Sequence, residues 1–157
     1  MRKKILLFLK LLVFTSFFIS CADKNPSIQS KSQAVQMLII SPLVRINDSG
    51  FIHFEKNAIK IQVYGAGAGL FEMKISEQIC INSACQKPET FNQKFFGDAY
   101  YSGLLADIIS SKEIFSSKGS PNECGGFSQK ISNIEYEVCP TKTTFKNKKT
   151  RIEFSLD

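Results

Sequence analysis

The chain has 157 residues, 20 of them basic and 14 acidic, which gives a formal net charge of +6. A chain of this length holds one domain with a core of its own. The first 20 residues contain Arg2, Lys3, Lys4 and Lys10, so the remaining residues carry 16 basic and 14 acidic side chains. The positive charge therefore belongs mainly to the N-terminal end, and we expect no binding to nucleic acid.

The N-terminus has the pattern of an export signal. Met1-Arg2-Lys3-Lys4 begins with basic residues, and the stretch from Ile5 to Ile19 is almost wholly apolar. A basic start, an apolar stretch of about fifteen residues and small residues after it are typical of a signal peptide. A membrane span needs roughly 20 apolar residues, so a signal peptide is favoured over the alternative of an uncleaved anchor.

The residues after the apolar stretch, FISCAD, resemble the cleavage site of a bacterial lipoprotein. The resemblance implies that residues 1–20 are removed and that Cys21 carries the acyl chains. Phe18 and Ile19 depart from the pattern, because a leucine and a small residue are usual at these positions. The alternative is ordinary cleavage after Ala22, since the residues before it also fit a small-x-small site.

Residues 21–33 are polar and show no periodicity, which suits a flexible tether between a membrane and a folded domain. We therefore divide the chain into the signal peptide, this tether and a single domain at 34–157. Ala22 directly after Cys21 resembles an outer-membrane address, from which Asp23 departs. We expect a lipid anchor in the outer membrane, with the domain facing the periplasm.

The domain is dominated by alternation of apolar and polar residues. A turn signal, Asp48-Ser49-Gly50, precedes one of the runs. The alternating runs are Val35–Ile40, Phe51–Phe54, Ile59–Tyr64, Phe71–Ser76, Ile134–Val138 and Ile152–Leu156. Alternation gives a strand one dry and one wet face, so we predict antiparallel strands in a mainly β fold, a curved sheet or barrel.

The stretch VYGAGAGLFEMKI, from Val63 to Ile75, raises the question of a phosphate-binding loop. A dinucleotide site needs G-x-G-x-x-G between a strand and a helix. Here the spacing is G-x-G-x-G and the next residues form a strand pattern, so no helix N-terminus is available for a phosphate. We predict instead that Gly65 to Gly69 joins two strands in a tight turn.

After Cys21, four cysteines remain, an even number that predicts two disulfides in an oxidising compartment. Of the three possible pairings we favour Cys80–Cys85 with Cys124–Cys139, because CINSAC places the first pair on facing sides of a short turn. A C-x-x-C motif is lacking and His53 is the single histidine, so we expect no metal site.

One segment, DAYYSGLLADIISSKEIF, has helical spacing instead. Its apolar residues are Tyr101, Leu104, Leu105, Ile108 and Ile109. Asp98 is placed to cap the first turn, although Gly103 weakens the helix. We predict one amphipathic helix from Asp98 onward, packed on the dry face of the sheet.

Catalysis is not expected. His53 lies in a strand pattern without a supported nucleophile, and Glu135 and Glu137 share the wet face of another strand. A basic cluster near the C-terminus consists of Lys142, Lys146, Lys148, Lys149 and Arg151. We interpret this cluster as a solvated turn, with binding of anionic head groups as the alternative. We expect no cofactor.

Residues 59–75, IKIQVYGAGAGLFEMKI, resemble the middle hairpin of the LolA/LolB lipoprotein-localisation fold, LolB in particular. The order that follows is also similar: a short hairpin at Ile79 to Gln86, the helical segment YYSGLLADII, and a final hairpin from Pro140 to Asp157. The resemblance covers most of Val35–Asp157, in pattern more than in identity. It implies a half-open antiparallel β-barrel with a helix across its concave face.

The resemblance also implies a function, the uptake of lipoprotein acyl chains between sheet and helix. The residues expected to line such a cavity are Ile59, Ile61, Val63, Phe71, Met73, Ile75, Leu105 and Ile109. The expected hand-over loop toward the membrane consists of Gly65, Ala66, Gly67, Ala68 and Gly69. In LolB this turn carries a protruding leucine, whereas here the tip is small and the nearest large apolar residue is Leu70.

We therefore expect a membrane-anchored lipoprotein that binds acyl chains and accepts lipoproteins from a periplasmic carrier. The alternative is a structural or interaction lipoprotein, a disulfide-stapled β domain whose core is filled. The alternating dry-face residues suit both outcomes.

Overall fold

The computed structural model describes residues 31–65 and 68–156 of the chain. The predicted signal peptide, the proposed lipid site Cys21 and most of the predicted tether lie outside the described residues, as do Ala66, Gly67 and Asp157. No helix in the described part of the chain is long and apolar enough to cross a membrane.

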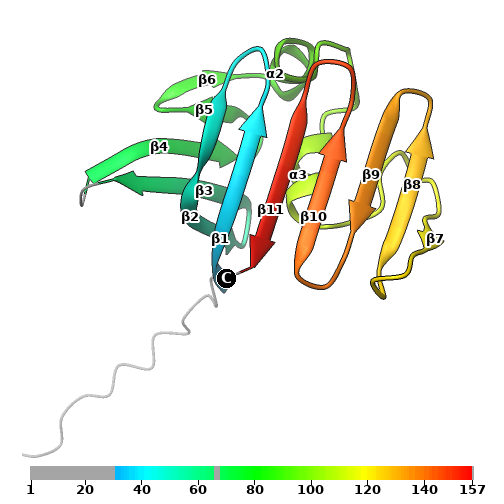
Figure 1. Cartoon of the computed structure of the whole chain (residues 1–157). Coiled ribbons are helices and arrows are strands. Elements are labelled where there is room, and N and C mark those ends of the chain that lie inside the picture. The colour runs from blue at the N-terminus through cyan, green and yellow to red at the C-terminus, as the bar shows by residue number, and fades with distance from the viewer. Residues whose placement is uncertain (1–30, 66–67, 157) are drawn as a thin grey trace, which may run out of the picture.

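The fold is mainly β, as predicted, and consists of one antiparallel sheet that does not close (Figure 1). Its strands are β1 (Lys31–Ile40), β2 (Arg45–Glu55), β3 (Ala58–Gly65), β4 (Ala68–Ile75), β5 (Ile79–Ile81), β6 (Ala84–Gln86), β7 (Ser120–Pro121), β8 (Phe127–Ile131), β9 (Ile134–Val138), β10 (Lys142–Lys146) and β11 (Arg151–Leu156). They lie in the order β6-β5-β4-β3-β2-β1-β11-β10-β9-β8-β7, so the first and last strands are central neighbours. Strand β1 begins at Lys31, inside the segment predicted as tether.

One face of the sheet, here called the inner face, carries the core. In β1 the buried residues Val35, Met37 and Ile39 alternate with more exposed ones. Opposite them in register stand Leu156, Phe154 and Ile152 of β11. Because pairing fixes which side chains share a face, these alternating residues form a continuous apolar surface, as the sequence predicted.

The predicted turn at Asp48-Ser49-Gly50 is wrong, because β2 runs through these residues without a break. Gly50 pairs with Val63 of β3 and with Val35 of β1. A Cβ at Gly50 would lie 2.3 Å from the carbonyl oxygen of Gln62. The glycine therefore permits the close approach of β2 and β3. In the sequence alone, a glycine with this role cannot be told from a glycine in a turn.

The helical prediction is correct in kind but too long. Helix α3 spans only Leu104–Ile109, and its apolar residues Leu104, Leu105, Ile108 and Ile109 are all buried. Asp98 does not cap it, since the N-cap position is Gly103 and has no side-chain cap. Tyr101, predicted to lie on the helix, precedes it, and its hydroxyl donates a hydrogen bond of 2.8 Å to the Asp107 carboxylate.

A second helix, α2 (Pro88–Phe96), was not predicted. Its signals are present: Pro88 at the start, Glu89 in the first turn, and Phe91 and Phe95 one turn apart. Gly97, with φ of 76°, ends it in the left-handed conformation. Residues 97–103 between α2 and α3 are not helical, although the sequence predicts a helix from Asp98 onward.

The two helices lie on the same face of the sheet, in Figure 1 behind the hairpin drawn in red and orange, β11 and β10. Phe96 of α2 packs edge-on against Phe145 of β10, with ring centroids 5.3 Å apart. Buried Asn147 in the β10–β11 turn donates to the Phe96 carbonyl at 3.0 Å, and Thr150 donates to that of Phe95 at 2.6 Å. This turn therefore fixes the end of α2, whose carbonyls have no partner within the helix.

The two favoured disulfides are confirmed, Cys80–Cys85 and Cys124–Cys139. The first joins the facing residues of the β5–β6 hairpin. The predicted turn between Gly65 and Gly69 joins β3 to β4, so this stretch is a hairpin and not a phosphate loop.

Candidate functional site

The inner face has an open pocket at the end where β1 begins, with a volume of about 480 Å³. We call it the β1/β11 pocket. It is lined by Lys31, Gln33, Val35, Phe54, Ile109, Ser110, Ser111, Lys112, Cys139, Pro140, Thr141, Lys142, Thr143, Phe154 and Leu156. Most of its exposed surface is apolar, and its volume falls in the roughly 300–1,000 Å³ range of small-molecule sites.

The strand pattern explains why apolar groups meet in this pocket. Phe54 of β2 and Phe154 of β11 occupy inner-face positions near the ends of their strands, and Val35 lies in the middle of β1 on the same face. Ile109 ends α3 above them, and the short helix reaches no further. The sheet thus extends beyond its helical cover, and the accessible apolar side chains of the pocket are the half-buried Phe54 and the exposed Leu156.

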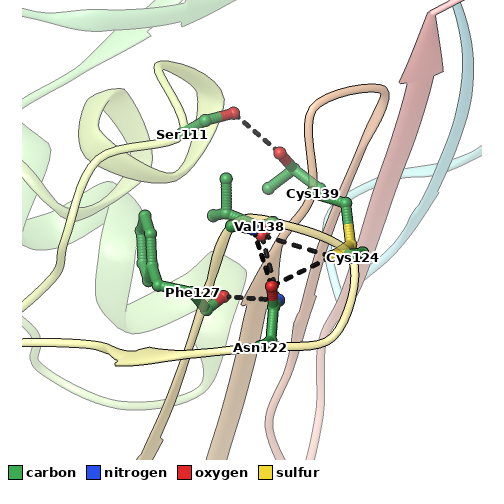
Figure 2. Close-up of a disulfide and its surroundings, with 8 residues drawn as sticks. Ser111, Asn122, Cys124, Phe127, Val138 and Cys139 are labelled. Carbon is green, nitrogen blue, oxygen red and sulfur yellow. Dashed lines mark hydrogen bonds between the residues drawn. A yellow bond between two sulfur atoms is a disulfide. The ribbon is translucent and has the colours of Figure 1, made fainter.

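One wall of the pocket is held by polar and covalent links (Figure 2). Ser111, directly beyond α3, shares a hydrogen bond of 2.7 Å with the hydroxyl of Thr143 in β10. Cys139 in the β9–β10 turn is joined to Cys124 by a disulfide. Figure 2 shows Asn122 beside this bridge, where its amide donates to the carbonyls of Phe127 and Val138 at 3.1 Å each. The turn that forms the wall is therefore fixed on both sides.

The charged side chains in the described lining of the pocket are all positive. Its described lining includes Lys31, Lys112 and Lys142 but no acidic residue. Lys142 is neutralised from the outer face, because its Nζ lies 3.5 Å from an oxygen of Glu153. Burial raises the pKa of Glu153, but Arg151 and Lys142 outweigh this effect and leave the pKa below its ordinary value.

The residues predicted to line a cavity lie mainly in the filled core. Six of the eight belong to the buried cluster between sheet and helices: Ile61, Val63, Met73, Ile75, Leu105 and Ile109. Ile59 and Phe71 pack against its edge. Ile109 is the one member of the predicted set that lines the β1/β11 pocket. Alternation identified the inner face correctly, but it does not show where the helices stop.

A second pocket, of about 460 Å³, lies beside the β3–β4 hairpin and is lined by Val63 and Phe71. We call it the hairpin pocket. Its exposed surface is more polar than apolar, with Arg45 and Asp48 among the lining residues. Leu70 also lines it and is 60% exposed, whereas Ala66 and Gly67 of the predicted hand-over loop lie outside the described residues. The carboxylate makes this pocket the less suitable site for an apolar chain.

The remaining candidate residues lie on outer surfaces. His53 is on the outer face of β2 and stacks on Phe51, with ring centroids 6.1 Å apart. Glu135 and Glu137 are exposed on β9, as predicted. The basic cluster occupies β10, the β10–β11 turn and the first residue of β11, and all of its members are exposed. Two of them, Lys142 and Arg151, pair with Glu153.

One group of possible metal ligands occurs among the described residues, Cys124, Glu137 and Cys139. The two sulfur atoms are bonded to each other, so neither is available as a thiolate, the form that binds metals. This group therefore provides no metal site in its oxidised form.

In comparisons with known proteins, no family model and no curated protein matches the chain. The likeness to the LolA/LolB fold remains a resemblance of pattern. What the described structure establishes is a disulfide-bonded, open antiparallel sheet with two short helices on one face and a pocket beyond their end.

Proposed function

We propose that this protein is a membrane-anchored lipoprotein that binds an acyl chain in the β1/β11 pocket. The observation that carries the proposal is a mostly apolar pocket of about 480 Å³ at the end of the sheet where β1 begins. Burial of a hydrocarbon chain there is favourable by about 25 cal/mol for each Å² removed from water.

The position of the pocket fits the proposed anchor. Cys21 would carry the lipid, and the roughly ten residues from Cys21 to Lys31 span at most about 35 Å when extended. The pocket would therefore lie close to the membrane that holds the anchor. Two disulfides are typical of an oxidising compartment, which supports a location in the periplasm on the outer membrane.

We further propose that the chain bound belongs to a lipoprotein received from a periplasmic carrier. The LolB resemblance supports this role, and Leu70 beside the predicted hand-over loop offers an exposed apolar side chain. The test is to mix the protein with a lipoprotein-loaded carrier and to follow whether the lipoprotein moves. Transfer supports the acceptor role, whereas binding of lipid without transfer contradicts it.

The acyl-binding proposal is tested with the full chain, expressed with its own leader and reconstituted in phosphatidylcholine vesicles. A palmitate that carries a diazirine on its chain is added, activated by light, and the label on the protein is measured. Leu156→Asp places a carboxylate in the pocket wall at a residue that is already 42% exposed, so the fold tolerates it. We expect strong labelling of the unmodified chain and at least about a tenfold loss in Leu156→Asp.

Ser155→Asp is the matched control, because it adds the same charge one residue away on the outer face, opposite Lys142. It should label like the unmodified chain. Circular dichroism establishes that both variants are folded. Equal labelling of the two folded variants would place the acyl chain outside the β1/β11 pocket and overturn the proposal.

A non-catalytic interaction lipoprotein is the second candidate, and the filled core between sheet and helices favours it. Phe91, Phe95 and Leu105, for example, are at most 1% exposed. This candidate predicts no palmitate labelling in the pocket and a protein partner recovered by cross-linking in a salt-sensitive manner.

A further inference from the structure

Two cationic side chains stand at the mouth of the β1/β11 pocket. Lys31 begins β1 at an inner-face position, in line with Gln33 and Val35. Lys112 follows the end of α3 and also lines the pocket. Both are exposed, so their ammonium groups are accessible to a ligand that enters from solvent.

These two lysines differ from the third lysine of the lining. Among the described residues, neither Lys31 nor Lys112 has a carboxylate within 4.0 Å, whereas Lys142 is paired with Glu153. The described lining contains no acidic side chain that would offset the two charges. The mouth of the pocket therefore attracts anions, while its deeper walls are apolar.

Hydrogen-bond donors accompany the charges. Gln33, Ser110 and Thr141 line the pocket together with the lysines. Amide and hydroxyl groups donate to anionic oxygens, and such charge-assisted bonds are stronger than neutral ones. Val35, Ile109 and Phe154 also line the pocket, and because they are buried they form its apolar inner wall.

We propose, on the basis of the acyl-binding function above and independently of the lipoprotein-acceptor role, that the pocket binds a free single-chain lipid with an anionic headgroup. Lys31 and Lys112 hold a carboxylate or phosphate at the mouth, and the chain lies along Phe54, Phe154 and Leu156. The volume of about 480 Å³ is in the lower part of the usual range of roughly 300–1,000 Å³, which suits one chain and not several.

The test compares headgroups on the same diazirine-bearing chain. The full chain in phosphatidylcholine vesicles is labelled with the palmitate, with its neutral methyl ester and with the corresponding lysophosphatidate, at equal content in the vesicles. The pH is kept high enough to ionise the fatty acid. We expect the anionic probes to label about tenfold more than the ester at low ionic strength, and the advantage to shrink with added salt.

The double variant Lys31→Gln, Lys112→Gln should lose this advantage while labelling by the ester remains. Lys146→Gln is the matched control, since it removes an exposed lysine that lies outside the pocket lining, and it should keep the preference. Comparison of palmitate with lysophosphatidate identifies whether the bound anion is a carboxylate or a phosphate. Equal labelling by ester and anions in the unmodified chain, or a preference that survives in the double variant, overturns the proposal. Failure of every probe to label would instead contradict acyl binding itself.

Discussion

Ser111 Oγ and Thr143 Oγ1 lie 2.7 Å apart, and their hydrogen bond joins the end of α3 to β10. It is a direct polar link between the helical layer and the sheet at the wall of the β1/β11 pocket. Thr143 is 3% exposed, so its hydroxyl depends on Ser111 for a partner.

Replacement of this hydroxyl should weaken the fold. Thr143→Val keeps the shape of the side chain but removes the bond, and we expect a loss of about 1 kcal/mol in the free energy of unfolding. Urea unfolding followed by circular dichroism measures it. Thr144→Val, at the next residue and on the outer face, should change stability by less. Equal effects of the two changes would show that the Ser111 bond adds nothing.

The two disulfides should differ in both stability and function. Cys124–Cys139 spans 15 residues and Cys80–Cys85 spans 5, so their loss should cost about 3 and about 2 kcal/mol. Because Cys139 lies in the pocket wall, the Cys124→Ser, Cys139→Ser variant should also label less with the diazirine palmitate. The Cys80→Ser, Cys85→Ser variant should label normally. Normal labelling of the Cys124→Ser, Cys139→Ser variant would mean that the pocket does not depend on the wall held by Cys139. Equal loss of labelling in both variants would mean that the effect is one of general stability and not of this wall.

Removal of a buried hydroxyl should stabilise the protein. Tyr136 is 1% exposed, and its hydroxyl has no hydrogen-bond partner among the described residues. Tyr136→Phe keeps the ring contacts with Phe127 and Phe145 while the unpaired polar group is lost. We expect the free energy of unfolding to rise by about 1 kcal/mol. A destabilised variant would indicate a hydrogen bond that this structure lacks.

The same residue should affect stability in alkali. Burial, followed by the nearby Asp107 carboxylate and Tyr101, raises the pKa of Tyr136 above its ordinary value of 10.0. The unfolded chain therefore loses the proton first, so stability is retained below pH 10.0 and falls as the pH rises beyond it. The free energy of unfolding, measured across this pH range, should fall less steeply in Tyr136→Phe. Part of the slope should remain, because burial and Asp107 also raise the pKa of Tyr101.

Because β2 and β3 approach closely at Gly50, the addition of one methyl group there should lower stability. Gly50→Ala would place its Cβ 2.3 Å from the Gln62 carbonyl oxygen, and the backbone must shift to avoid the clash. We expect a loss of about 1–3 kcal/mol in the free energy of unfolding. Gly69→Ala is the control, since nothing lies within 4 Å of its Cβ position. A neutral Gly50→Ala would show that the glycine is not required for strand contact.

Most of the sheet could be predicted from the sequence, because alternation is a local signal. Val35, Met37 and Ile39 repeat every second residue, and pairing only has to bring such faces together. The disulfide of CINSAC is equally local, since Cys80 and Cys85 stand on facing positions of one hairpin. The helices are harder to predict from the sequence. Both α2 and α3 are short. Gly97 ends α2 and Gly103 precedes α3, so the bounds of the helices depend on these glycines and on packing more than on the spacing of apolar residues.

The pocket could not be located from the sequence, because its existence depends on where the helical cover stops. Ile61 and Ile109 have the same apolar character and both lie on the inner side of the fold. Both are buried, but only Ile109, the last residue of α3, lines the β1/β11 pocket. Likewise, Lys31 was placed in the tether, and only its pairing with Phe54 identifies it as an inner-face residue at the pocket mouth.

The most direct test of acyl binding is to map the cross-linked site. The full chain in phosphatidylcholine vesicles is labelled with the diazirine palmitate and digested, and the labelled residues are identified by mass spectrometry. We predict label at the end of β11, around Phe154 and Leu156, and at the end of α3, around Ile109. Label confined to the hairpin pocket around Leu43 and Leu70, or no label on the described residues at a saturating amount of probe, would contradict the proposed function.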